Sequence, residues 1–268
     1  MAYVVGLIAT DGNLSRERFC ISVASKDADL LETVRRCLNL TNRITPYTGK
    51  RCYHIQWRDR VFHDWLIRLG LTPAKSLTLG PITVPSEYFA DFFRGCIDGD
   101  GTILVYTDRY NTAKKSQYVY ERLYVSLVSG SRAFVDWLRA ELNRLVGVAG
   151  DIHERRKPNR APLWRLRYAK ADSIRLIRWM YYSPDVPCLG RKRAKAERFL
   201  QPLGHSRRPH VGRPRAGWLY NEPVTRPSIQ RERGGGVAKL ATAIDSKSIA
   251  RKGLGVRVPS PLPTNSLP

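Results

Sequence analysis

The feature that most constrains this chain is a nine-residue motif that occurs twice. Residues 4–12 read Val-Val-Gly-Leu-Ile-Ala-Thr-Asp-Gly, and residues 93–101 read Phe-Arg-Gly-Cys-Ile-Asp-Gly-Asp-Gly. Both copies have the order apolar, variable, Gly, apolar, Ile, variable, small, Asp, Gly, and strand-like sequence follows each of them. Two matched copies predict a fold built from two related repeats.

Small residues recur four positions apart in both copies. Gly6 and Thr10 form one such pair, and Gly95 and Gly99 form the other. On a helix each pair lies on one face as a ridge of small side chains. Two such ridges allow two helix backbones to approach more closely than the usual separation of roughly 8–10 Å. We therefore predict a helix interface made by these four residues.

The aspartates at the ends of the motifs are the candidate metal ligands. Asp11 and Asp100 would lie at the C-terminal ends of two adjoining helices, with Gly12 and Gly101 in the left-handed cap conformation. Each carboxylate would meet the negative end of a helix dipole and the charge of its twin, and both interactions are unfavourable. A divalent cation removes the conflict, and Mg²⁺ prefers oxygen ligands. The alternative is two ordinary helices that end in Asp-Gly, a common turn dipeptide.

The motif pair resembles the LAGLIDADG homing endonucleases in their single-chain, two-motif form, over residues 2–203. The resemblance implies an α+β fold of two pseudo-symmetric αββαββα repeats, packed through the two motif helices, with antiparallel sheets forming a DNA-binding saddle. It also implies that Asp11 and Asp100 bind the catalytic metal, Mg²⁺. Ala9 departs from the family pattern where the second copy keeps Asp98. That position is not the metal ligand in the family, so the departure does not indicate an inactive protein.

Hydrophobic periodicity predicts the same order of elements in both halves. In the first half we expect a strand at 18–25, a helix at 27–40, a hairpin at 44–47 and 52–57, and a helix at 61–69. In the second half we expect a helix at 87–100, strands at 102–107 and 118–129, a helix at 132–146, a hairpin at 151–156 and 163–168, and helices at 174–182 and 191–200. The predicted domains are a first repeat at 1–70, a Pro- and Gly-punctuated linker at 71–85, a second repeat at 86–203 and a tail at 204–268.

The charge balance predicts a polyanionic partner. Lys and Arg number 46 against 23 Asp and Glu, which gives a net charge of +23. Charge alone does not separate DNA from RNA, and a ribosome-associated or generally basic protein is the plainer alternative. A two-stranded ribbon fits a major groove, where Arg and Gln can read base edges. The candidate DNA-binding residues from the predicted strands and their loops are Arg16, Arg18, Lys50, Arg51, Arg109, Lys114, Lys115, Arg122, Arg155, Arg156, Arg160, Arg165 and Arg167.

Hydrolysis of a phosphodiester needs an activated water and a stabilised leaving oxygen, and metal ions held by Asp11 and Asp100 can supply both. The resemblance also implies a basic or polar residue from each sheet near that water. Alignment of the last strand of each repeat places Gln56 opposite Arg167, with Lys170 just beyond. We predict Lys170 and Gln56 as further catalytic residues, although Lys170 fits equally well as a surface lysine ahead of a helix.

The function predicted from these features is a monomeric, Mg²⁺-dependent, site-specific endonuclease that cuts double-stranded DNA. An RNA maturase that binds intron RNA would share the fold and the charge. A non-cleaving DNA-binding regulator of this fold would usually have lost the motif acids, and this chain has both.

Cysteine usage and hydropathy limit the cellular compartments in which we expect this protein. The five cysteines include no CxxC pair, which favours reduced thiols over a zinc site or a disulfide framework. No apolar run approaches a membrane span, and the short apolar stretch at 3–10 lacks the basic region of a signal peptide. We expect a protein of a bacterial or archaeal cytoplasm or of an organelle, not a secreted one.

The tail from residue 204 changes composition to Arg, Pro, Gly and Ser without apolar periodicity. This predicts a disordered basic arm that adds salt-sensitive DNA affinity. A second hypothesis starts from the genetic code, because residues 237–241 and 256–259 can be encoded by the D-arm and T-arm consensus sequences of a tRNA gene. The reading frame would then run into a downstream tRNA gene.

Overall fold

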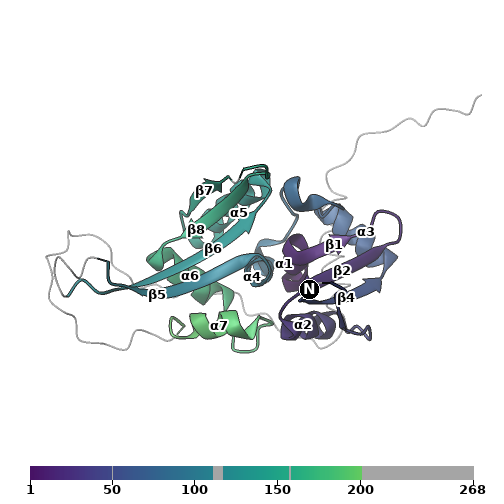
Figure 1. Cartoon of the computed structure of the whole chain (residues 1–268), viewed down its shortest axis with the longest axis horizontal. Helices are drawn as coiled ribbons and strands as arrows, with labels where there is room; N and C mark the ends of the chain where they lie inside the picture. The colour runs from purple at the N-terminus through teal and green to yellow at the C-terminus, as the bar shows by residue number, and fades with distance from the viewer. Residues whose placement is uncertain (50, 111–116, 157, 201–268) are drawn as a thin grey trace, which may run out of the picture. The chain divides into compact units, whose positions relative to one another are not determined.

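The computed structural model describes residues 1–49, 51–110, 117–156 and 158–200. Within these ranges an α+β arrangement occurs twice, and the predicted αββαββα order is confirmed (Figure 1). The first copy consists of α1 (Ala2–Asp11), β1 (Gly12–Leu14), β2 (Cys20–Ser25), α2 (Ala28–Leu38), β3 (Thr45–Pro46), β4 (Tyr53–Arg58) and α3 (Arg60–Leu69). The second consists of α4 (Phe89–Asp98), β5 (Gly101–Asp108), β6 (Tyr120–Ser129), α5 (Arg132–Val146), β7 (Asp151–Arg155), β8 (Leu163–Tyr168) and α6 (Lys170–Met180).

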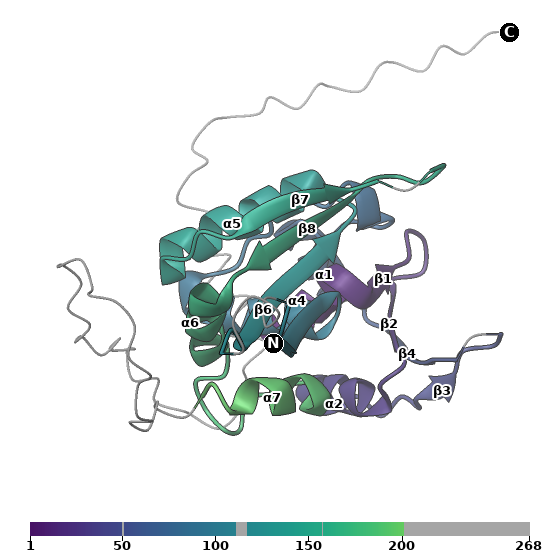
Figure 2. The ribbon, with the colours of Figure 1, turned by 60° about the vertical axis from the view of Figure 1, so that its left-hand side comes forward.

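Three further helices of the described residues lie outside the two copies. The short 3₁₀ helices η1 (Lys75–Leu77) and η2 (Ser86–Tyr88) connect the copies, and α7 (Gly190–Glu197) follows the second. Figures 1 and 2 show α7 and α2 of the first copy arranged nearly end to end, and Arg191 near the start of α7 contacts Asp27 just before α2. The domain limits at 70, 85 and 203 stay a prediction, and the tail at 204–268 lies outside the described residues.

Each copy contains one antiparallel four-stranded sheet, and the two sheets have equivalent strand orders. The orders are β1-β2-β4-β3 and β5-β6-β8-β7. In the first sheet Asn13 pairs with Ser22 and Ser22 with Gln56. In the second sheet Thr102 pairs with Ser126 and Ser126 with Arg167. Gln56 and Arg167 therefore occupy equivalent positions, two strands away from the residue that follows the motif.

Alternation along the strands divides each sheet into an apolar and a polar face. In the first sheet the buried face carries Ile21, Val23, Ile55 and Trp57. In the second it carries four fully buried leucine and valine side chains, which are Leu123, Val125, Leu127 and Leu166. Gln56 and Arg167 each lie on the polar face of their own sheet. Each pairs with a serine on that face, Ser22 for Gln56 and Ser126 for Arg167, because paired residues in an antiparallel ladder share one face.

The motif helices α1 and α4 cross with their backbones in contact. A Cβ atom added to Gly6 would lie 2.0 Å from the Phe92 carbonyl oxygen, and one added to Gly95 would lie 2.0 Å from the Tyr3 carbonyl oxygen. A Cβ on Gly99 would lie 2.0 Å from Thr10 Oγ1. Only glycine fits at these contacts, so the small residues set how closely the helices approach.

The prediction that Gly12 adopts the left-handed cap conformation is wrong. Its φ of −90° and ψ of 154° are extended, because the chain passes from α1 directly into β1. Gly101 likewise enters β5 without a positive φ. Glycine is needed for space instead, since a Cβ on Gly12 would lie 2.5 Å from Ile8 Cα and one on Gly101 2.5 Å from Ile97 Cα.

Among the described residues, no helix combines the length and the hydrophobicity that crossing a membrane requires.

Candidate active site at the ends of the motif helices

The two motif aspartates lie where the crossing helices end. Asp11 is the last residue of α1, and Asp100 follows α4 by two residues. A Cβ on Gly99 would lie 3.3 Å from Asp11 Oδ2, so the carboxylate of the first motif touches the backbone of the second motif. Beside it, Thr10 Oγ1 donates to the Gly6 or the Leu7 carbonyl at 3.1 Å, which fixes the last turn of α1.

The surroundings disfavour a negative charge on both carboxylates. Burial, together with the charge of Asp100, raises the pKa of Asp11 to about 6. Burial also raises the pKa of Asp100, and Lys192 and Lys75 act in the opposite direction. Two adjoining carboxylates with raised pKa values are a favourable place for a cation, because it removes both the repulsion and the desolvation cost.

The donor set fits Mg²⁺. In the part of the chain that the structure describes, no three His, Cys, Asp or Glu side chains gather into a metal site. Asp11 and Asp100 would offer a metal ion a pair of hard oxygen donors. Mg²⁺ is commonly bound in this way, through one or two carboxylates with substrate phosphates and water completing the shell.

Lys192 is buried beneath the second motif end. Its side chain is 4% exposed, and Nζ lies within hydrogen-bond distance of four carbonyl oxygens, those of Ile97 (2.7 Å), Asp98 (2.8 Å), Gly99 (3.1 Å) and Gly101 (2.8 Å). The ammonium therefore caps the C-terminus of α4, where a helix dipole favours a cation. Burial lowers the pKa of Lys192 to about 8.

Lys75 has the equivalent position in the first repeat. It lies in η1, is 5% exposed, and its Nζ donates to the Gly12 carbonyl, the counterpart of Gly101. Burial lowers the pKa of Lys75 to about 8, and the charges of Asp100 and Asp11 oppose this shift. One buried lysine therefore supports each motif end from within the protein.

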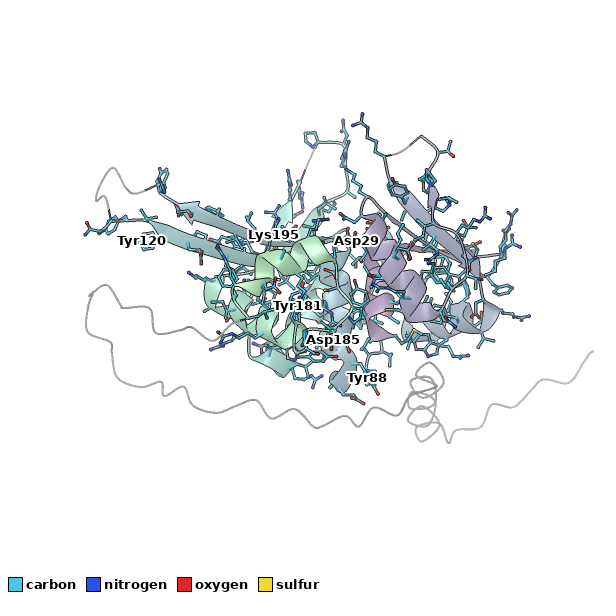
Figure 3. All side chains as sticks on the ribbon, turned by 90° about the horizontal axis from the view of Figure 1, so that it is seen from below. Asp29, Tyr88, Tyr120, Tyr181, Asp185 and Lys195 are labelled. Carbon is cyan, nitrogen blue, oxygen red and sulfur yellow. The ribbon has the colours of Figure 1, made fainter. Side chains whose placement is uncertain are left out.

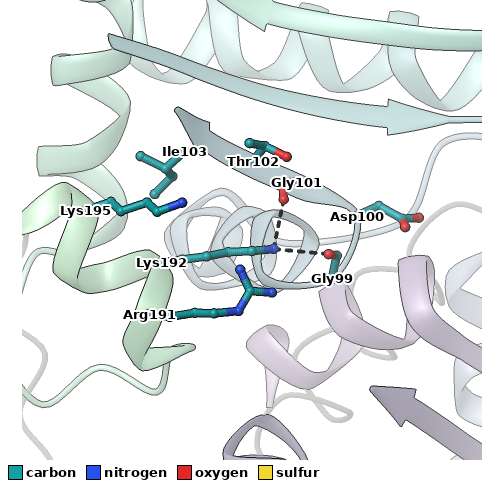
Figure 4. Close-up of a pocket in the computed structure, with 8 residues that line it drawn as sticks. All are labelled: Gly99, Asp100, Gly101, Thr102, Ile103, Arg191, Lys192 and Lys195. Carbon is teal, nitrogen blue, oxygen red and sulfur yellow. Dashed lines mark hydrogen bonds between the residues drawn. The ribbon is translucent and has the colours of Figure 1, made fainter. Parts of the chain in front are cut away.

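Two recesses open beside the aspartate pair. One has a volume of about 300 Å³ and is lined by Asp100, Thr102, Lys192, Lys195 and Arg191, among others. Figure 4 shows the Lys192 ammonium pointing at the carbonyls of Gly99 and Gly101 inside it. The other, of about 270 Å³, includes Asp11 and also reaches Arg191.

Arg191 links α7, the helix that carries Lys192, to the first repeat. Its Nε donates to Asp27 Oδ1 at 2.8 Å and its Nη2 to Asp27 Oδ2 at 2.7 Å, and Asp27 precedes α2. The hydrogen bond from Arg191 lowers the pKa of Asp27. The helix that positions Lys192 is thus anchored across the boundary between the repeats.

Asp98, the acidic residue that the first motif lacks, is buried in the same region. The Tyr3 hydroxyl donates to its Oδ2 at 2.9 Å, and the Leu189 backbone N–H donates to the same atom at 2.7 Å. Burial raises the pKa of Asp98 to about 6. It joins α1, α4 and the start of α7 and lies inside the helix interface.

Comparison with known proteins identifies the fold. No protein-family model matches the sequence, and no curated protein matches it either. Among solved structures, the LAGLIDADG meganuclease I-AabMI bound to uncleaved DNA matches with a TM-score of 0.50 and 13% identity, over 74% of this chain and 87% of that chain. The chain has the LAGLIDADG homing endonuclease fold.

Two further solved structures with this fold are similar to the chain. The LAGLIDADG homing endonuclease I-LtrWI bound to its target DNA matches with a TM-score of 0.49 and 14% identity, over 74% of this chain and 87% of that chain. I-DmoI in complex with DNA and Ca matches with a TM-score of 0.49 and 17% identity, over 72% of this chain and 94% of that chain.

Within this LAGLIDADG fold, the structure does not bring Lys170 to the motif carboxylates. Lys170 is an exposed residue at the start of α6, and its Nζ lies 3.7 Å from Glu121. Glu121 pairs with Thr107, six residues along β5 from Gly101, a distance of about 20 Å at roughly 3.3 Å per residue. The catalytic role predicted for Lys170 stays a prediction, whereas Lys75 and Lys192 are the lysines that contact the motif ends.

The candidate DNA-binding residues divide by location. Arg122, Arg155, Arg165 and Arg167 share the polar face of the second sheet. Those in loops or at strand ends are exposed, and they are Arg16, Arg18, Arg51, Arg109, Arg156 and Arg160. Lys50, Lys114 and Lys115 lie outside the described residues.

Sequence reasoning missed Lys75 and Lys192, the two buried lysines that contact the motif ends. No sequence signal singled them out, because they lie in a Pro- and Gly-punctuated segment and in a run of basic residues.

Proposed function

We propose that this protein is a site-specific endonuclease that hydrolyses phosphodiester bonds in both strands of a DNA duplex, with a divalent metal held between Asp11 and Asp100. The observation that carries the proposal is the meeting of these carboxylates at the ends of two crossing helices, with a buried lysine beneath each. A regulator that only binds DNA has no use for a pair of acids whose mutual repulsion destabilises the fold.

Asp11 and Asp100, one from each repeat, would together supply the carboxylate oxygen ligands of that metal. Mg²⁺ bound there would supply an activated water and stabilise the leaving oxygen. Lys75 and Lys192 hold the backbone at Gly12 and Gly101 in place, so the two carboxylates keep a fixed separation. The ammonium groups also offset the negative charge of the aspartates before a cation binds.

The polar faces of the two sheets would bind the duplex. Gln56 and Arg167, at equivalent register positions near the motif ends, would contact the DNA close to the scissile bonds. Arg167 is held in place by Tyr124, since its guanidinium carbon lies 4.9 Å from the ring centroid. The two-repeat architecture supports this assignment, since it offers one polar sheet face for each half of a duplex target.

The test is cleavage by the full chain of a plasmid library that carries random target sequence, in Mg²⁺, in Ca²⁺ and in EDTA. Wild type is compared with Asp100→Asn, and with Asp185→Asn as a matched control that removes an exposed acid from a loop. We expect discrete Mg²⁺-dependent double-strand cuts that Asp100→Asn loses and Asp185→Asn keeps.

Tight DNA binding without cutting in any metal would refute the nuclease and favour a regulator. Weak DNA binding with tight, specific binding of a structured intron RNA would favour a maturase instead.

A further inference from the structure

The two repeats differ most in the hairpin that follows each motif. In the first repeat β1 and β2 pair over three positions, from Gly12 with Val23 to Leu14 with Ile21. In the second repeat β5 and β6 pair over eight positions, from Gly101 with Leu127 to Asp108 with Tyr120. Figure 1 shows β5 and β6 continuing well beyond the motif helix α4. The pseudo-symmetry of the fold therefore fails in this hairpin.

The difference amounts to a measurable length of DNA. Five additional ladder positions at about 3.3 Å each extend the second hairpin by about 16 Å. Base pairs in a duplex rise by about 3.4 Å, so this extension spans about five base pairs.

The polar face of the extension carries aromatic and apolar side chains where the rest of the sheet carries arginines. Leu104 is 45% exposed, Tyr106 44% and Tyr120 46%, and register places all three on the face of Arg167. Figure 3 shows Tyr120 far along the hairpin from α7 and the motif helices. Tyr106 stacks on Tyr124, with ring centroids 6.4 Å apart.

The charges on this face cancel. The one arginine on the paired part of the extension, Arg122, donates from Nε to Asp108 Oδ2 at 2.9 Å. The backbone N–H of Tyr110, which donates to Asp108 Oδ1 at 3.0 Å, and then Arg122 lower the pKa of Asp108. A face without net charge attracts the phosphate backbone weakly, and its exposed apolar side chains can contact thymine methyl groups in the major groove.

The extension is also fixed to the protein body. On its opposite face Glu121 forms an ion pair with Arg198 and lies 3.7 Å from Lys170 at the start of α6. Lys170, predicted from sequence as a catalytic residue, is placed to brace the hairpin that carries the exposed tyrosines. A braced ribbon can hold a fixed register on a groove.

We propose that the target of this protein is asymmetric, with a half-site that is four to five base pairs longer on the side of the second repeat. Over this added length Leu104, Tyr106 and Tyr120 contact thymine methyl groups in the major groove. A two-stranded ribbon fits the major groove, and only thymine presents an apolar methyl group there. The inference rests on the proposed function, because it needs a DNA duplex on the polar sheet faces.

Hydroxyl-radical footprinting of the full chain on the intact target sequence found in the cleavage assay, with Ca²⁺ in place of Mg²⁺, tests the asymmetry. We expect protection to extend four to five base pairs farther on one side of the cut. The triple variant Leu104→Ala/Tyr106→Ala/Tyr120→Ala should lose protection at that outer end alone. The control Val61→Ala removes an apolar side chain that is 78% exposed on α3 and should leave the footprint unchanged.

Replacement of thymine by uracil tests the proposed contacts with thymine methyl groups, because it removes only the methyl group from the base. Each methyl group removed from the outer part of the long half-site should weaken binding about fourfold, as the transfer of one buried methyl group implies. The same replacement should have no effect on the triple variant. A symmetric footprint, or wild-type binding that ignores the methyl groups, would overturn this inference while leaving the endonuclease intact. Absence of specific DNA binding would instead remove the proposed function itself.

Discussion

Asp11→Asn should abolish cleavage and, at neutral pH, stabilise the protein. The pKa of Asp11 is raised from 3.8 to about 6, so the folded state resists the charge that the unfolded state carries freely. Each unit of pKa is about 1.4 kcal/mol, and a shift of about two units sets an upper bound near 3 kcal/mol. Because part of the shift comes from the coupled charge of Asp100, we expect a gain of about 1–3 kcal/mol in the free energy of unfolding.

The gain should depend on pH with a definite sign. Above pH 6 the Asp11 carboxylate is ionised in both states, so the folded state bears the full penalty and the asparagine variant shows its full advantage. Between pH 6 and about 4 the folded state takes up a proton that the unfolded state does not, so wild type recovers stability. Below about pH 4 the carboxyl is neutral in both states, and the advantage of the variant disappears.

Urea unfolding in EDTA at pH 4, 5, 6, 7 and 8 measures this effect, since EDTA removes the cation that would stabilise wild type. Asp185→Asn, which removes an exposed carboxylate away from the site, serves as the control and should change stability little at any of these pH values. A variant that is less stable than wild type at pH 7, or a gain of equal size at pH 4, would refute the electrostatic account of the site.

Three further predictions concern the parts that support the site. Gly95→Ala should lower the free energy of unfolding, measured by urea titration, by about 2 kcal/mol, since the added Cβ would lie 2.0 Å from a backbone carbonyl oxygen. In the control Gly80→Ala the added Cβ meets no atom within 4 Å, so stability should not change. Lys192→Met should reduce the single-turnover cleavage rate by about 10²-fold or more while DNA affinity in Ca²⁺ is retained. Lys195→Met, which changes a lysine of the same recess, should keep activity. Equal losses for both variants would contradict a special role of the buried lysine. Asp27→Asn should cost less than about 1 kcal/mol of stability but increase the ratio of nicked to linear plasmid, and an unchanged ratio would show that the anchor of α7 does not affect the second strand cut.

The fold was largely predictable because its signals are local. The small residues of the two motifs occupy one helix face in any helical conformation, so the spacing of Gly6 and Gly95 within their motifs was enough to identify the helix contact. Alternation along the strands likewise separated Ile55 and Trp57 from Gln56, because side chains in a strand point to opposite faces. The left-handed conformation expected for Gly12 was wrong, since the strand that begins there imposes an extended backbone.

The sequence by itself determined the two repeats, their element order and the aspartate pair, because repeated motifs and periodic patterns report the local geometry of the chain. Only the tertiary structure decided which lysines support that pair. Lys75 reaches Gly12 across 63 residues and Lys192 reaches Gly101 across 91, and neither contact leaves a periodic trace in the sequence. In the sequence these two lysines look like ordinary members of an irregular and a basic segment. Only the assembled fold buries them and places their ammonium groups beneath the motif ends.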